Sequence, residues 1–291
     1  MRVLITGCNG QVGHCLVNQL KEKVELLAVD RAELDITDRH AVSQTVVEFK
    51  PDFIINAAAH TAVDKAEEEV DLSYAINCDG PLYLAQAAKL VDATILHIST
   101  DYVFPGNKDG EYVEDDETGP LGVYGKSKLA GEIALSKANV KHIILRTAWV
   151  FGVHGNNFVK TMLRLGKDRD ALSIVGDQFG GPTYAADIAS ALIEIMDQLN
   201  QTNDSSKYGV YHFSGEPHVS WFEFAQLIFE EAEQKQLLSP PTLSSITTDM
   251  YPTPAARPEN SKMNCTKINS AFGIKASDWQ EALKNIEAYT G

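Results

Sequence analysis

A tyrosine and a lysine that could together transfer a proton lie four residues apart, at Tyr124 and Lys128. Side chains at this spacing share one face of a helix, and residues 124–137 have a helical pattern. A free tyrosine has a pKa of about 10, but a neighbouring ammonium stabilises the phenolate and lowers that pKa. We therefore expect Tyr124, with Lys128 beside it, to protonate the alkoxide formed when hydride reaches a ketone. Two ordinary surface residues of a helix would show the same spacing.

Hydroxyl groups at the end of a predicted strand favour the chemical interpretation. Residues 94–99 form a β-rich run that leads into Ser99 and Thr100. In open α/β sheets, ligands bind at the carboxyl ends of the strands. Ser99 or Thr100 could therefore hydrogen-bond a substrate carbonyl and complete a set of hydroxyl, tyrosine and lysine.

A glycine-rich turn between the first predicted strand and the first predicted helix could hold a phosphate. Gly7, Gly10 and Gly13 allow a tight turn and a close approach of the backbone to a pyrophosphate. Gln11 and Val12 open the helix, whose N-terminus offers N–H donors to the anion. The spacing is G-x-x-G-x-x-G, and a purely structural turn could also use three glycines. Its position directly after an apolar strand favours nucleotide binding.

The end of the second predicted strand leaves the choice of nicotinamide cofactor open. Asp30 could accept hydrogen bonds from the adenosine ribose, which favours NADH. Arg31 follows at once and could hold the 2′-phosphate of NADPH. We therefore expect NADPH or NADH, and an ordinary exposed Asp-Arg pair is the structural alternative.

The order of the predicted elements indicates an α/β fold with a doubly wound parallel sheet of Rossmann type and a smaller C-terminal substrate-binding lobe. Buried strands are predicted at residues 3–6, 26–30, 53–57, 94–99 and 143–147. Helices are predicted at 11–21, from an N-cap at Thr37 to 49, at 71–90 and at 124–137. We expect a dinucleotide-binding domain at 1–150, with a segment at 185–213 returning to it. Residues 151–184 and 214–291 would form the lobe, with an extended loop or flap at the proline-rich residues 239–260.

Composition excludes several classes of protein. The chain has 291 residues, is 44% hydrophobic and has a formal charge of −15, which disfavours nucleic acid and anionic lipid as partners. It contains no apolar run long enough for a membrane span, and its first residues do not resemble a signal peptide. The four cysteines have neither C-x-x-C nor zinc spacing. We expect a cytoplasmic protein.

Taken together, these motifs resemble the extended short-chain dehydrogenase/reductase superfamily and, within it, the dTDP-4-dehydrorhamnose reductase family. The resemblance covers nearly the whole chain and is carried by residues 56–67, 99–106, 124–132, 146–151, 155–159 and 257–261. It implies that NADPH or NADH reduces the C4 ketone of a dTDP-linked 4-keto-6-deoxy sugar, dTDP-4-dehydro-β-L-rhamnose. Thr100, Tyr124 and Lys128 would be the catalytic set.

The resemblance also implies binding residues. The cofactor site would extend to Asp35, Ile36, Ala57, Ala58 and Ala59. Tyr124 and Lys128 would also contact the cofactor, Lys128 through the ribose of the nicotinamide nucleotide. The substrate would contact Thr61, Val63, Tyr102, Trp149, Asn157 and Arg257. From the residues alone, Trp149 could equally be a core aromatic. Arg257 has no obvious structural partner, and its fork of donors suits a diphosphate.

Some members of the family are described as dimers bridged by magnesium through carboxylates. Cys15 and Ala186 stand at two of those places here, so we expect no metal and a monomer or weak homodimer. Hydride transfer itself needs no metal.

The alternatives come from the same superfamily and from one different class of protein. A 4,6-dehydratase would carry a glutamate where this chain has Tyr102. A 4-epimerase or another nucleotide-sugar reductase would share the motifs. A regulatory subunit of the methionine adenosyltransferase type would bind a partner without catalysis.

Overall fold

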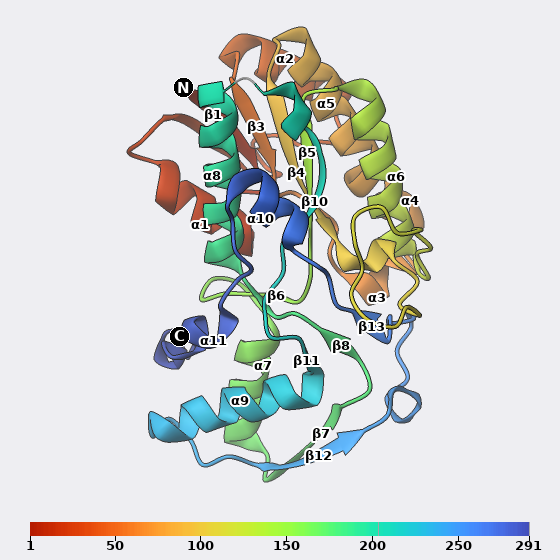
Figure 1. Cartoon of the computed structure of the whole chain (residues 1–291), viewed down its shortest axis with the longest axis vertical. Helices are drawn as coiled ribbons and strands as arrows, with labels where there is room; N and C mark the ends of the chain where they lie inside the picture. The colour runs from red at the N-terminus through yellow and green to blue at the C-terminus, as the bar shows by residue number, and fades with distance from the viewer. Residues whose placement is uncertain (203, 291) are drawn as a thin grey trace.

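The computed structural model describes residues 1–202 and 204–290, and its frame is a six-stranded sheet (Figure 1). The strand order is β10-β5-β4-β3-β1-β2, and all neighbouring strands are parallel. Their bounds are β1 Arg2–Thr6, β2 Glu25–Val29, β3 Phe53–Asn56, β4 Thr94–Thr100, β5 His142–Thr147 and β10 Gly209–His212. The predicted α/β class with a doubly wound parallel sheet is confirmed.

Helices cover both faces of this sheet, which explains why its strands are apolar throughout. In β1, Val3 and Ile5 join one buried cluster with α1 (Gln11–Leu20) and α8 (Ala185–Thr202). Leu4 points the other way, into a cluster with α2 (Arg39–Phe49) and α5 (Gly80–Leu90). Successive side chains of a strand point to opposite faces, so a strand covered on both sides loses the polar alternation of an exposed sheet.

Two predicted helices differ in detail from the structure. The helix expected after Thr37 begins at Arg39, and Asp38 is its N-cap, accepting the N–H groups of His40 and Ala41. Thr37 is not the cap because its hydroxyl donates to Asp35. The helix expected at 71–90 consists of α4 (Val70–Tyr74) and α5, joined by a π turn at Ala75–Asp79.

The part of the molecule that is lowest in Figure 1 has its own apolar cluster. It is formed by α7 (Phe158–Asp168), α9 (Trp221–Gln234) and the paired strands β7 (Ala171–Val175) and β12 (Thr242–Ile246). The expectation of a continuous loop at 239–260 is wrong, because β12 lies within it. The five prolines of this segment flank β12 rather than interrupt it, so every residue of the strand keeps its N–H.

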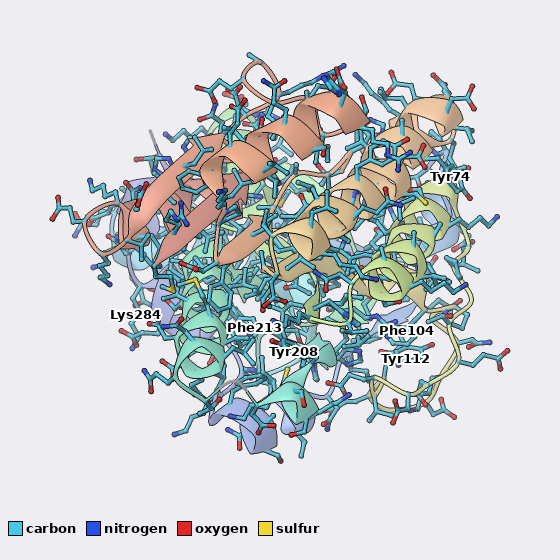
Figure 2. All side chains as sticks on the ribbon, turned by 90° about the horizontal axis from the view of Figure 1, so that it is seen from above. Tyr74, Phe104, Tyr112, Tyr208, Phe213 and Lys284 are labelled. Atoms are coloured by element: carbon cyan, nitrogen blue, oxygen red, sulfur yellow. The ribbon has the colours of Figure 1, made fainter. Side chains whose placement is uncertain are left out.

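Short elements complete the chain and connect its two parts. They are α3 Val63–Ala66, β6 Val150–Phe151, β8 Phe179–Gly180, β9 Thr183–Tyr184, β11 Val219–Ser220, β13 Asn260–Ser261, α10 Thr266–Phe272 and α11 Trp279–Leu283. Phe104 and Tyr112, labelled in Figure 2, stack with ring centres 4.3 Å apart. The helix α10 packs on α8 and β10, so the chain returns to the sheet twice after residue 150. The predicted division at 1–150, 185–213, 151–184 and 214–291 stays a prediction.

No helix in the described part of the chain combines the length and apolar character needed to cross a membrane.

Candidate active site

A cleft of about 540 Å³ opens at the carboxyl ends of β1, β3, β4 and β5. Parallel strands place these ends at one edge of the sheet, so segments far apart in sequence meet there. Of the residues expected in a site, the cleft is lined by Gly10, Gln11, Val12, Ala57, Ala59, Thr61, Val63, Thr100, Tyr102, Tyr124, Lys128 and Trp149. The predicted catalytic set thus shares one cavity with the glycine turn.

A second hollow of about 250 Å³ continues the cleft beneath the glycine turn. Gly10, Ala57 and Ala59 line both cavities. The remaining expected cofactor residues in the second hollow are Gly7, Asp30, Arg31, Asp35, Ile36 and Ala58. Together the two cavities reach from the predicted catalytic set to Asp30 and Arg31, as an extended dinucleotide would require.

The glycine turn can be built only from glycines at two positions. Gly7 has φ +72°, and a Cβ atom there would lie 2.6 Å from the backbone nitrogen of Ala58. A Cβ atom on Gly13 would lie 2.1 Å from the carbonyl oxygen of Gly7. No side chain of the described residues caps α1 at Gly10, so its first N–H groups are open to an anion. The turn therefore fits the diphosphate of a nicotinamide dinucleotide.

Asp30 and Arg31 differ in how firmly the protein holds them. The Asp30 carboxylate accepts from Asn9 Nδ2 at 2.5 Å and from the N–H of Ala32 at 2.8 Å. The Arg31 side chain is 74% exposed and reaches Asp35 at 3.5 Å. Hydrogen bonds from Thr37 hold the pKa of Asp35 below its usual value. The exposed Arg31 side chain can therefore turn toward a phosphate, whereas two hydrogen bonds fix the Asp30 carboxylate at the edge of the smaller cavity.

Tyr124 and Thr100 are close neighbours in the cleft, but the electrostatics differ from expectation. Desolvation raises the pKa of Tyr124 to about 12, although a hydrogen bond to Thr100 opposes the shift. The Thr100 hydroxyl also donates to Asp101 Oδ1 at 2.9 Å. In this arrangement the pKa of Tyr124 is therefore raised, not lowered as expected, and Lys128 Nζ has hydrogen-bond partners of its own.

Lys128 is only 1% exposed, and its Nζ faces strand β4. Nζ donates to the carbonyl of Ile98 at 2.7 Å and lies 3.2 Å from His97 Nε2. Burial lowers the pKa of Lys128 to about 8. The helical spacing correctly predicted that Lys128 shares a face with Tyr124, but it could not predict the partners of the amine.

The sequence interpretation named Ser99 as a binding group but missed two other polar groups of the cleft, Asp101 and Thr147. Within the described residues, Ser99 Oγ, Asp101 Oδ2 and Thr147 Oγ1 are buried without a hydrogen-bond partner. Burial raises the pKa of Asp101 to about 6. All three residues line the cleft, and buried polar atoms normally have partners. Ser99 Oγ and Thr147 Oγ1 are therefore available to a bound molecule, and the position of Asp101 directly after Thr100 was its signal in the sequence.

Trp149 lies between the cleft and the lower apolar cluster, so both roles considered for it stay predictions. It lines the cleft, and its ring stacks on Trp221 with centroids 3.5 Å apart and an angle of 8°. Its φ of +47° is unusual for a residue other than glycine, and such strain is common at functional sites. Trp221, far along the chain, was not predicted to support the site.

Arg257 does have a protein partner, contrary to expectation. Its Nη2 lies 2.9 Å from Asp64 Oδ2, and Nη1 donates to the carbonyl of Ala255. The positive charge of Arg257 acts to lower the pKa of Tyr102, although burial dominates and raises it. Arg257 thus stands near Tyr102 without lining the cleft itself.

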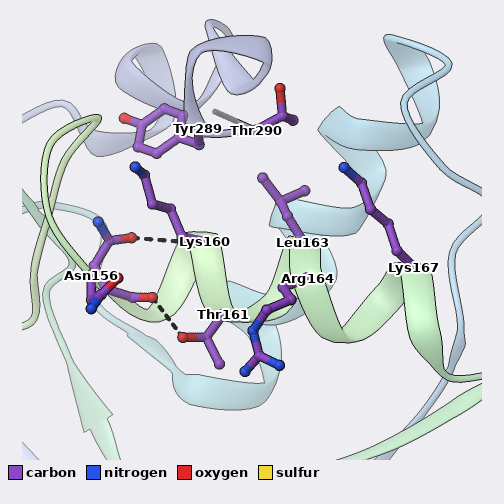
Figure 3. Close-up of a pocket in the computed structure, with 9 residues that line it drawn as sticks. Asn156, Lys160, Thr161, Leu163, Arg164, Lys167, Tyr289 and Thr290 are labelled. Carbon is purple, nitrogen blue, oxygen red and sulfur yellow. Dashed lines mark hydrogen bonds between the residues drawn. The ribbon is translucent and has the colours of Figure 1, made fainter.

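Asn157 is the N-cap of α7, and its amide is occupied by the protein. Nδ2 donates to Gln11 Oε1 at 3.1 Å and to the carbonyl of Gly152 at 2.7 Å, while Oδ1 accepts the N–H of Lys160. Its neighbour Asn156 lines the cleft. Asn156 also reaches a separate hollow beside α7, where Figure 3 shows three cationic side chains, those of Lys160, Arg164 and Lys167.

The whole chain matches one protein family. The family model described as the RmlD substrate binding domain matches residues 1–290. A dTDP-4-dehydrorhamnose reductase from Aggregatibacter actinomycetemcomitans is 55% identical over 291 residues, which cover 99% of each chain. The chain belongs to the dTDP-4-dehydrorhamnose reductase family.

Solved structures of this family share the fold. A dTDP-4-dehydrorhamnose reductase from Clostridium acetobutylicum has a TM-score of 0.92 and 43% identity, covering 99% of this chain and 98% of that one. One from Bacillus anthracis, in complex with NADP, has a TM-score of 0.90 and 40% identity, with 98% of each chain covered. The family resemblance inferred from the motifs is thereby confirmed.

The positions relevant to a metal bridge in the dTDP-4-dehydrorhamnose reductase family hold no carboxylate here. Cys15 is half-buried on α1, and Ala186 lies in the first turn of α8. Across residues 1–202 and 204–290, no three His, Cys, Asp or Glu side chains gather closely enough to hold a metal.

Proposed function

We propose that this chain reduces the C4 ketone of dTDP-4-dehydro-β-L-rhamnose with NAD(P)H, giving dTDP-L-rhamnose. The observation that carries the proposal is the shared cleft of Thr100, Tyr124 and Lys128, continuous with the glycine turn. The names of the most similar relatives support the choice of sugar nucleotide. The NADP complex of the Bacillus anthracis relative supports the cofactor class.

The cofactor would lie along both cavities. Gly7, Gly10, Gln11, Val12 and Gly13 would hold its diphosphate through backbone N–H groups and close approach. The adenosine end would lie among Asp30, Arg31, Asp35, Ile36, Ala57, Ala58 and Ala59. Bound NAD(P)H supplies the hydride. Since Asp30 suits a ribose and Arg31 suits a 2′-phosphate, we propose that both NADH and NADPH are accepted.

Tyr124 would supply the proton. Its raised pKa keeps the phenol protonated at neutral pH, so a donor is available in nearly every molecule. As the ketone oxygen gains negative charge, the O–H bond of Tyr124 breaks and the proton moves to that oxygen. Thr100 would hydrogen-bond the same oxygen, and the charge of Lys128 would stabilise the phenolate that remains.

The substrate would enter from the side of the cleft away from the glycine turn. Thr61, Val63, Tyr102 and Trp149 would border the sugar. A diphosphate would compete with Asp64 for the guanidinium of Arg257. The loop at Asn157 would contribute through Asn156, because the Asn157 amide is already engaged.

The remaining proposals concern the setting of the enzyme. The four cysteines are all free, which supports a reducing cytoplasm. The charge of −15 supports the expectation of no nucleic-acid partner. Cys15 and Ala186 support a monomer or a weak homodimer without a metal bridge.

The test is oxidation of NADPH and of NADH, followed by nicotinamide absorbance, with enzymatically generated dTDP-4-dehydro-L-rhamnose. UDP- and GDP-linked keto sugars run in parallel. Tyr124→Phe should lower the rate by roughly 10²–10⁴-fold while cofactor binding persists. Tyr83→Phe, on α5, is the matched control and should keep full activity. Wild-type turnover by Tyr124→Phe would remove the assigned role. Absence of oxidation with every sugar, despite cofactor binding, would favour a regulatory subunit.

A further inference from the structure

A buried chain of hydrogen bonds connects Lys128 with three strands of the sheet. Lys128 Nζ lies 3.2 Å from His97 Nε2, and His97 Nδ1 lies 3.0 Å from Asn56 Nδ2. On the far side, the Thr6 hydroxyl donates to Asn56 Oδ1 at 2.8 Å. These residues lie on α6 (Val123–Ala138), β4, β3 and β1, and all four are almost completely buried. The proposed proton donation by Tyr124 gives a role to Lys128 but none to His97, Asn56 or Thr6.

The chain determines which nitrogen of His97 carries the hydrogen. Asn56 Oδ1 also accepts the backbone N–H of Ala58 at 3.1 Å, so the oxygen of the amide faces Ala58 and the nitrogen faces His97. An amide nitrogen only donates, so His97 Nδ1 must accept. Burial lowers the pKa of His97 well below its usual value, so the ring is neutral. Its single hydrogen is therefore on Nε2.

The hydrogen on Nε2 points at Lys128 Nζ. An ammonium has donors and no lone pair, so it would oppose this N–H. A neutral amine can accept from Nε2 and still donate to the carbonyl of Ile98 at 2.7 Å. Burial lowers the pKa of Lys128 although Glu132 acts to raise it, and the Glu132 carboxylate is bound to Arg146. The hydrogen-bond geometry and the burial both favour the neutral amine at this position.

We propose that His97 is a positioning residue: its Nε2–H, oriented by Asn56, holds Lys128 as a neutral amine against β4, and protonation of that amine releases the side chain into the cleft. The proposal rests on the proposed role of Lys128 in the reduction. On release, the amine takes one proton from solvent and loses the hydrogen bond from Nε2. The ammonium then lies near Tyr124, where it stabilises the phenolate left by proton donation.

The groups that titrate around Lys128 come from both elements packed against it. His97 approaches from β4, and Asp101 lines the same cleft just after that strand. Tyr124 and Glu132 lie one turn before and one turn after it on α6. Because release requires protonation of the amine, the fraction of released Lys128 should fall as pH rises, and the activity should fall with it.

The first test observes the wild-type enzyme, with no need for turnover. Lysine is labelled with ¹³C at Cε, and the Lys128 signal is assigned with Lys128→Met. The signal should titrate with a midpoint of about 8, whereas an exposed lysine titrates at about 10.4. A midpoint at the ordinary value would overturn the proposal, even if the chain proves to be an active reductase. An inactive chain with the low midpoint would refute only the proposed function.

The second test changes the tautomer of His97. In Asn56→Asp, the carboxylate keeps the acceptor for its other partners and takes the hydrogen of Nδ1, so Nε2 becomes an acceptor for the ammonium. In His97→Gln, an amide oxygen can accept from Lys128. Both variants should raise the Lys128 midpoint and the alkaline limb of the kcat/KM profile by about one pH unit or more. His40→Gln, an exposed histidine on α2, is the control and should change neither. Unchanged profiles in folded variants would overturn the proposal.

Discussion

Replacement of Glu132 by glutamine should destabilise the enzyme, because Glu132 is one half of a buried ion pair. Arg146 Nη2 lies 2.7 Å from Glu132 Oε2, and Nε lies 3.0 Å from Oε1. The two side chains are 5% and 4% exposed. The guanidinium also lies over the ring of Phe104 at 5.0 Å. The pair joins α6, which carries Tyr124, to strand β5.

The magnitude follows from this burial. Removing one partner of a buried pair costs about 3–5 kcal/mol, and the glutamine amide would keep one acceptor for the guanidinium, so we expect about 3 kcal/mol. Unfolding entropy is about 2.1 cal/mol/K per residue, which gives about 0.6 kcal/mol/K for a chain of this length. The melting temperature of Glu132→Gln should therefore fall by about 5 °C.

Calorimetry or circular dichroism of the full chain measures the effect. The control is Glu281→Gln, which breaks a surface pair with Lys284 whose side chains are 65% and 64% exposed. Because water screens that pair, its loss should shift the melting temperature by less than about 1 °C. Equal shifts in the two variants would refute the argument that burial makes the Glu132–Arg146 pair stabilising.

Three further predictions concern the site. Burial raises the pKa of Asp101 from 3.8 to about 6, so the folded state binds the proton more tightly than the unfolded state. The free energy of unfolding should therefore fall by about 3 kcal/mol as pH rises from below 3.8 to above 6. Asp101→Asn should abolish that loss in thermal melts measured below and above this pH range. Gly13→Ala would place a Cβ atom 2.1 Å from the carbonyl oxygen of Gly7 and should weaken NADPH binding at least about tenfold, as measured by fluorescence titration. In the control Gly119→Ala the nearest atom to the new Cβ would be 3.4 Å away, so NADPH binding should be normal. Arg257→Ala should raise the substrate KM about tenfold or more at nearly unchanged kcat. An unchanged KM would exclude a role of Arg257 in diphosphate binding. The control Asp64→Asn frees the guanidinium and should not raise the KM.

Local patterns were sufficient to predict most of the frame. The apolar runs identified the five strands from β1 to β5 because a strand buried on both faces must be apolar along its length. The proline-rich segment 239–260 misled the prediction, because prolines show where a strand cannot be but say nothing of the residues between them, five of which form β12. The register of β12 on β7 pairs Thr242 with Ala171, which is about seventy positions earlier in the chain.

For the candidate site, too, some features followed from the sequence and others only from the tertiary structure. The sequence by itself determined which segments meet at the sheet edge, because parallel strands place their carboxyl ends at one edge and residues four apart share one face of a helix. Only the tertiary structure decided what each side chain faces. Arg257 is bound by Asp64, which is 193 positions earlier. Lys128 is directed at His97, because a buried amine must take its partners from whichever strand packs against its helix.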